Sequence, residues 1–199
     1  MKNKLFLGLV ATLFVAVFTS CDKLPQAEID AANNAVEQAK VAGADIYLAD
    51  QYLAVQDSLK LTMEKIEVQK SKMFRSYDEP KKQLAVVTEM AVKLQENTEI
   101  RKEEVKNEVL AAIEEVKNIQ AENNTLLVKA PKGKEGAAAL ESIKSEMGVI
   151  DASLTEISAL FDKGEYMSAL DKVKASKEKA AGINEELKSA IAKVTKARR

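Results

Sequence analysis

The sequence predicts an all-α protein: an elongated antiparallel helical bundle with coiled-coil-like hairpins, made of about five helices with one long central helix. Two observations support this prediction. Ala, Val, Leu, Ile, Lys and Glu dominate the 199 residues, whereas only 7 Gly and 3 Pro are available for turns. Apolar residues also recur at intervals of three and four almost throughout the chain, which is the spacing of one helix face.

Two helices are expected in the first part of the chain. The first is predicted at about 26–42, with a buried face of Ile29, Ala32, Val36 and Ala39. Gly43 then favours a helix end, because glycine tolerates the left-handed backbone that follows many helices. The second helix is predicted at about 45–73, and its apolar stripe comprises Leu48, Tyr52, Val55, Leu59, Thr62, Ile66 and Met73.

A long third helix is expected at about 79–128, because this segment contains no Gly and no Pro after Pro80, and proline is tolerated in a first turn. Its two halves do not share one heptad phase, and the almost wholly polar segment 95–104 separates them. We expect this helix to be the shared spine of two bundles; the alternative is a helix broken near 97–103 and one compact bundle. The stripe comprises Leu84, Val87, Ala91, Leu94, Val105, Val109, Ala112, Val116, Ile119 and Leu126.

Two further helices complete the prediction. Segment 131–136 contains one Pro and two Gly and marks a loop. A fourth helix is predicted at about 136–162, and a fifth at about 165–197 after the break at Lys163 and Gly164. The resulting organisation is a first helical bundle at 26–100 and a second at 101–199.

The residue types exclude most catalytic chemistry. The chain has no His and one Cys, so it has no Ser-His-Asp triad, no Cys-His pair, no His metal ligand and no internal disulfide. Adjacent glutamates such as Glu103 and Glu104 point about 100° apart on a helix and make no acid/base pair. We therefore expect no enzyme activity, no catalytic residues, no cofactor and no metal.

The first 20 residues have the pattern of a signal peptide. Lys2 and Lys4 precede an apolar run of 14 residues, 5–18, which is too short to span a bilayer comfortably. Segment 18–21, Phe-Thr-Ser-Cys, resembles the cleavage site of bacterial lipoproteins. The resemblance implies cleavage between Ser20 and Cys21, lipidation of Cys21, a short tether at 21–25 and a membrane-anchored chain in the bacterial cell envelope, at the outer membrane.

Two weaker resemblances concern the mature chain. Residues 21–199 resemble Ala-rich helical envelope lipoproteins, in which a lipidated Cys precedes a short helix and a junction such as 43–47, Gly-Ala-Asp-Ile-Tyr. That resemblance implies location and architecture, and no activity. Segment 164–170, Gly-Glu-Tyr-Met-Ser-Ala-Leu, resembles half of a tetratricopeptide repeat without the full period.

The candidate partner surface consists of basic residues near the C-terminus and two tyrosines at helix junctions. Residues 164–199 hold nine basic and five acidic side chains, which favours contact with an anionic partner such as a wall polymer. The alternative is that these bases only complement the negative end of the last helix, and that aromatic rings only fill bundle ends. Nucleic acid is not an expected partner. The candidates are Lys188, Lys193, Lys196, Arg198, Arg199, Tyr77 and Tyr166.

These features predict a lipid-anchored, non-enzymatic scaffold or spacer that binds proteins of the envelope. The alternative is a periplasmic binding or chaperone-like module that holds polypeptide or an apolar ligand between the bundles. An open groove lined by Leu84, Val87, Val105 and Val109 would favour that alternative, and a closed seam would count against it. The oligomeric state, the choice between inner and outer membrane, and the choice between periplasmic and surface display stay open.

Overall fold

The structure is a computed structural model that describes residues 23–131 and 136–197, with side chains up to residue 194. Within these residues the chain forms six helices and no strand, so the predicted all-α helical bundle is confirmed. The helices are α2 (Gln26–Val41), α3 (Ala44–Tyr47), α4 (Ala49–Lys70), α5 (Asp78–Lys129), α6 (Gly136–Asp162) and α7 (Tyr166–Ala197).

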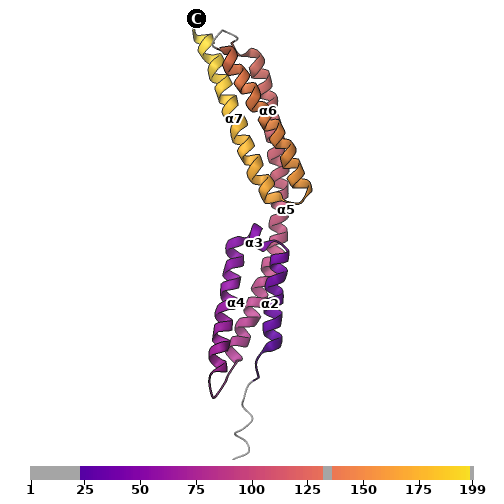
Figure 1. Cartoon of the computed structure of the whole chain (residues 1–199), viewed down its shortest axis with the longest axis vertical. Helices are drawn as coiled ribbons and strands as arrows, with labels where there is room; N and C mark the ends of the chain where they lie inside the picture. Colours follow the sequence, from indigo (N-terminus) through magenta and orange to yellow (C-terminus); the bar gives the residue numbers. More distant parts are fainter. Residues whose placement is uncertain (1–22, 132–135, 198–199) are drawn as a thin grey trace, which may run out of the picture. The chain divides into compact units, whose positions relative to one another are not determined.

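The long helix α5 is continuous over 52 residues, so it is not broken near 97–103. The chain divides by its packing into two compact units on either side of the bond between Glu99 and Ile100. Unit 1 contains α2, α3, α4 and the first part of α5, and unit 2 contains the rest of α5 with α6 and α7 (Figure 1). The boundary between the two bundles predicted from the sequence, between residues 100 and 101, lies one residue later.

Unit 1 is built around one buried apolar cluster supplied by α2, α3, α4, the first part of α5 and Tyr77 just before α5. The predicted face of α2 is buried, and so is the first half of the predicted α5 stripe. The cluster comprises Ile29, Ala32, Val36, Ala39, Ala44, Tyr52, Val55, Ile66, Tyr77, Leu84, Val87, Ala91 and Leu94.

The turn between α2 and α3 depends on Gly43. Its φ of 99° lies in the left-handed region, which glycine adopts without the steric cost that a Cβ atom brings. A Cβ built on Gly43 would also lie 3.2 Å from the Tyr47 ring. Gly43, which the sequence predicted as a helix end, thus has two features that favour glycine: its positive φ and its close contact with the Tyr47 ring.

The predicted helix at 45–73 is wrong in two respects. It is interrupted at Leu48, whose φ of −140° and ψ of 48° are not helical, so α3 and α4 are separate helices. It also ends at Lys70, and Met73 lies in the following loop with 87% of its surface exposed. Apolar spacing continues across Leu48, because Leu48 and Tyr52 are four residues apart, and spacing alone does not record a local change of φ.

Unit 2 packs α6 and α7 against the second part of α5. The α6–α7 turn passes through Gly164, whose φ is 80°. Beside this turn the rings of Phe161 and Tyr166 pack with centroids 5.1 Å apart and planes inclined at 58°. Fully or nearly fully buried apolar residues of this unit include Val105, Val109, Val116, Ile143, Ile150, Ile157, Leu170, Val173, Ile183 and Leu187.

Candidate functional site

Several of the predicted site residues lie outside the described part of the chain. These are the expected cleavage and lipidation residues Ser20 and Cys21, the basic residues Arg198 and Arg199, and the side chain of Lys196. Their assignment remains a prediction from the sequence.

The described basic residues of α7 lie on an exposed face. Lys188 and Lys193 are both exposed, and the ammonium group of Lys188 lies 3.1 Å from the Glu122 carboxylate of α5. Lys177 makes a similar ion pair with Glu115. Two of the basic side chains of α7, Lys177 and Lys188, therefore form ion pairs with α5 inside unit 2 and are not free to bind an anionic partner.

The two candidate tyrosines do not form a common surface with these lysines. Tyr166 is half-buried against Phe161, and it precedes Lys188 by roughly 33 Å along one helix at 1.5 Å per residue. Tyr77 is only 1% exposed and belongs to the core of unit 1. Its assignment to a partner surface is therefore wrong, because packing within the unit 1 core removes the ring from solvent.

The apolar residues that would have lined a binding groove near the middle of α5 are buried. Leu84 and Val87 are 0% and 2% exposed in unit 1, and Val105 and Val109 are 0% exposed in unit 2. Each pair packs inside its own bundle. These four side chains are therefore core residues that form no common open groove for polypeptide or an apolar ligand, although Val87 also borders one of the α4–α5 grooves described below.

A buried polar layer crosses unit 2, and we did not predict it from the sequence. Asn184 Nδ2 of α7 donates to Asn123 Oδ1 of α5 over 2.8 Å, and Asn123 Nδ2 donates to the Ala180 carbonyl over 2.9 Å. Asn123 is 0% exposed. The available signal was its position, since Asn123 follows Val116 by seven residues and Ile119 by four on the apolar stripe.

Gln120 extends this layer to α6. Its Nε2 donates to the Met147 carbonyl and to Asp151 Oδ1, both over 3.0 Å. Its Oε1 is buried and has no hydrogen-bond partner among the described residues. Buried polar groups of this kind specify helix register at a cost in stability, so we interpret the layer as structural.

Unit 1 exposes apolar side chains along the side where α4 meets α5. Two neighbouring grooves of about 460 and 260 Å³ lie there, and both are lined by Leu61 and Lys65. Leu61, Val68 and Val86 are each more than half exposed, although they are large and apolar. The other lining residues are Ser58, Thr62, Glu64, Gln69, Lys72, Glu79, Pro80, Gln83, Val87 and Met90.

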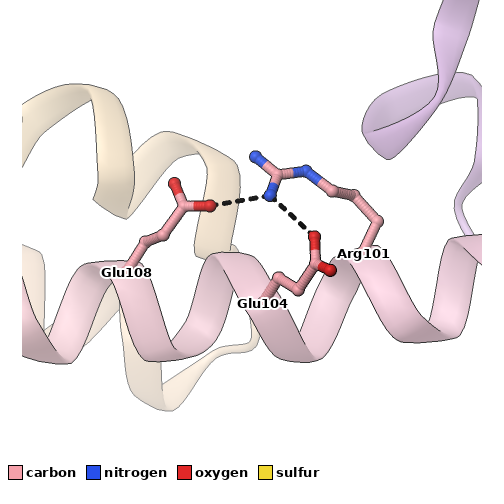
Figure 2. Close-up of polar contacts among 3 residues, drawn as sticks. All are labelled: Arg101, Glu104 and Glu108. Carbon is pink, nitrogen blue, oxygen red and sulfur yellow. Dashed lines mark hydrogen bonds and ion pairs between the residues drawn. The ribbon is translucent and has the colours of Figure 1, made fainter.

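Arg101 makes two ion pairs along the surface of α5. Arg101 Nη1 donates to Glu108 Oε1 over 2.7 Å and to Glu104 Oε2 over 3.1 Å (Figure 2). The hydrogen bond to Glu108, and then the one to Glu104, raises the pKa of the Arg101 guanidinium. These contacts join residues about one and two turns apart on the same helix.

Comparison with known proteins adds no family: no family model, no curated protein and no solved structure matches the chain. Among the described residues, no group of three or more acidic, Cys or His side chains is arranged to hold a metal ion. No described helix has the length and apolar character needed to cross a membrane.

Proposed function

We propose that this protein is a lipid-anchored scaffold of the bacterial cell envelope, which presents helical surfaces to protein partners and carries out no chemistry itself. The sequence supports the anchor through the lipoprotein-like segment that ends at Cys21. The same sequence lacks the residue types of the common catalytic constellations.

The observation that carries the scaffold proposal is the apolar surface along α4 and α5. Leu61, Val68 and Val86 are 57%, 56% and 54% exposed, and they border the two grooves described above. Glu64, Lys65 and Lys72 also border them. An apolar strip between charged residues suits the apolar face of an amphipathic helix laid into the groove.

The test is site-specific photocrosslinking in intact envelopes. A photoreactive amino acid replaces Leu61 or Val86 in the full chain. The control position is Lys60, which is exposed on α4 next to Leu61 but lines neither groove. We expect one protein adduct from both groove positions and none from the control. Equal adducts from all three positions, or adducts from none, would contradict a docking surface along α4 and α5.

The anchor is tested separately. We expect the mature chain to begin at Cys21 with acyl chains attached, as measured by mass spectrometry of protein purified from membranes. A Cys21→Ser variant should lose this mass and leave the membrane fraction. An unmodified Cys21 in the mature chain would contradict the anchor while leaving the groove experiment interpretable.

A further inference from the structure

The loop between α4 and α5 carries two adjacent apolar side chains that almost nothing covers. Met73 and Phe74 are 87% and 84% exposed, the highest values among the large apolar residues that the structure describes. An isolated exposed apolar residue needs no explanation. Here two large apolar side chains lie next to each other at the tip of a hairpin, which is less usual. Leaving them exposed forgoes the stabilisation that burial of apolar surface gives.

The base of this loop is firmly fixed. Ser71 Oγ donates to the Val68 carbonyl over 2.8 Å, and the Lys72 amide donates to the Gln69 carbonyl over 3.1 Å, which closes the end of α4. On the other side Tyr77 is buried in the core of unit 1. The loop therefore holds Met73 and Phe74 away from the bundle.

Basic residues flank this apolar tip in the sequence and are called the basic collar here; one of them, Lys70, is paired with Glu67 of the same helix over 2.5 Å. Segment 69–82 contains five basic residues, Lys70, Lys72, Arg75, Lys81 and Lys82, and two acidic ones, Asp78 and Glu79. Residues 23–68, which make up the rest of the α2–α4 part of unit 1, contain four basic and eight acidic residues. Positive charge is thus concentrated at this end of an otherwise acidic unit.

The described chain also begins at this end of unit 1. Figure 1 shows the start of α2 at the same end as the loop that joins α4 to α5. The residues just before α2 include exposed Lys23 and Leu24, which are again one basic and one apolar side chain. If the proposed anchor at Cys21 is correct, it lies only two residues before Lys23 and brings this end to the bilayer.

We propose that the Met73–Phe74 tip inserts into the headgroup region of a bilayer that contains anionic lipid. Amphipathic surfaces bind bilayers when apolar side chains reach the boundary of the acyl region and flanking cations attract anionic headgroups. The two side chains of the tip by themselves offer far less than the roughly 800 Å² per partner of a stable protein interface, whereas a bilayer accepts a small apolar tip flanked by cations. The orientation given by the anchor rests on the proposed function, whereas the tip and its collar do not.

The absence of tryptophan from the chain provides a direct probe. In the full chain, Phe74→Trp gives one tryptophan at the tip, and Val41→Trp gives one at the far end of α2, where the wild-type side chain is 74% exposed compared with 84% for Phe74. Both proteins are reconstituted into phosphatidylglycerol vesicles with brominated acyl chains, and into matching phosphatidylcholine vesicles. We expect a blue shift and loss of emission for the tip tryptophan in phosphatidylglycerol, and neither change for the control.

The collar is tested by charge reversal in the Phe74→Trp protein. Arg75→Glu with Lys82→Glu should restore emission in phosphatidylglycerol vesicles, whereas Lys40→Glu with Lys60→Glu, the same charge change elsewhere in unit 1, should leave the quenching intact. Circular dichroism checks that each variant is folded. Equal quenching at positions 74 and 41, or no quenching at position 74, would overturn the proposal.

The same samples separate this inference from the anchor. Acylated protein whose tip tryptophan stays unquenched would refute membrane insertion and leave the anchor in place. Unacylated protein whose tip tryptophan is quenched by added phosphatidylglycerol vesicles would refute the anchor and support the tip. An emission shift caused by lipid-free envelope proteins, with none caused by vesicles, would show a protein partner and overturn the lipid assignment.

Discussion

The side-chain amide of Asn184 donates a hydrogen bond to the Asn123 side-chain oxygen inside unit 2, over 2.8 Å and between helices α7 and α5. Both residues are nearly inaccessible to solvent, with exposed fractions of 6% and 0%. A shift of either helix by one turn would separate the two amides and leave them buried without partners. The pair therefore specifies the axial register of α5 against α7 more strictly than the surrounding apolar residues do.

The first prediction concerns this pair. Asn184→Ala should destabilise the full chain by about 2 kcal/mol, because Asn123 Oδ1 would remain buried without its hydrogen bond. The matched control is Asn124→Ala, since Asn124 is exposed beside Asn123, and its effect should stay within about 0.5 kcal/mol. Urea unfolding monitored by circular dichroism measures both values. Similar losses for the two variants would contradict the role of the buried pair.

The coupling between the two asparagines is predicted separately. Replacing both by leucine removes both polar groups. The double variant should therefore lose less unfolding free energy than the sum of the losses in Asn123→Leu and Asn184→Leu. Such a protein should also lose its unique register, which amide hydrogen exchange of α7 reports. Additive single and double effects would show that the two amides act independently.

A second prediction contrasts two glycines. Gly43→Ala should cost about 1–2 kcal/mol, because a φ of 99° strains an alanine and its Cβ would meet the Tyr47 ring. Gly182→Ala should instead stabilise the chain by about 0.5–1 kcal/mol, because Gly182 lies within α7 with open space around its Cβ position. Thermal unfolding of the two variants measures the difference, and a shift of the same sign in both would contradict this assignment.

A third prediction separates Tyr77 from the neighbouring loop. Tyr77→Ala should destabilise the protein by about 3 kcal/mol through the cavity it leaves in the unit 1 core. Phe74→Ala should change stability by less than about 0.5 kcal/mol, because the ring is already exposed. Urea unfolding provides the measurement. A loss of less than about 0.5 kcal/mol in Tyr77→Ala would contradict the burial of this tyrosine in the core.

A fourth prediction concerns the pH dependence of an ion pair on α5. Lys93 Nζ donates to Glu89 Oε1 over 2.6 Å, and this hydrogen bond, followed by the charge attraction, lowers the pKa of Glu89 and raises that of Lys93. The contribution to stability is thus present at neutral pH. It is lost as the pH falls through the lowered Glu89 pKa, or rises through the raised Lys93 pKa.

The measurement for this pair is an NMR titration of the Glu89 carboxyl group. In Lys93→Gln the pKa of Glu89 should return toward its ordinary value, whereas Lys60→Gln on another helix should leave it lowered. A Glu89 pKa that stays equally low without Lys93 would assign the shift to a different cause.

The helices themselves could largely be predicted from the sequence, because a buried helix face repeats every three or four residues. Helix α6 at Gly136–Asp162 agrees with the prediction at 136–162, and α2 ends one residue before the predicted end. The break at Leu48 could not be found this way. No Gly or Pro marks the position, so nothing in the local sequence indicates its φ of −140°.

Side-chain environments at helix ends were harder to predict than helices. Tyr77 and Phe74 are three residues apart at one junction, yet one is 1% exposed and the other 84%. Outside a helix, periodicity no longer tells which face a residue occupies, so the sequence could place aromatic residues near a hairpin end but could not orient them. The polar layer was missed for another reason, since an asparagine on an apolar stripe is identified as structural only when its partner on another helix is known.

The continuity of α5 has a consequence for any attempt to separate the two units. In an α-helix the carbonyl groups of one turn accept hydrogen bonds from amides four residues later. The carbonyls of residues 96–99, which belong to unit 1, therefore depend on the amides of residues 100–103, which belong to unit 2. A chain cut after Glu99 would keep the side-chain packing of unit 1 but would lose the donors for its last turn. The boundary between the two compact units is thus not a boundary for the backbone, and a cut after Glu99 would leave the carbonyls of residues 96–99 to be satisfied by water, as at any helix end.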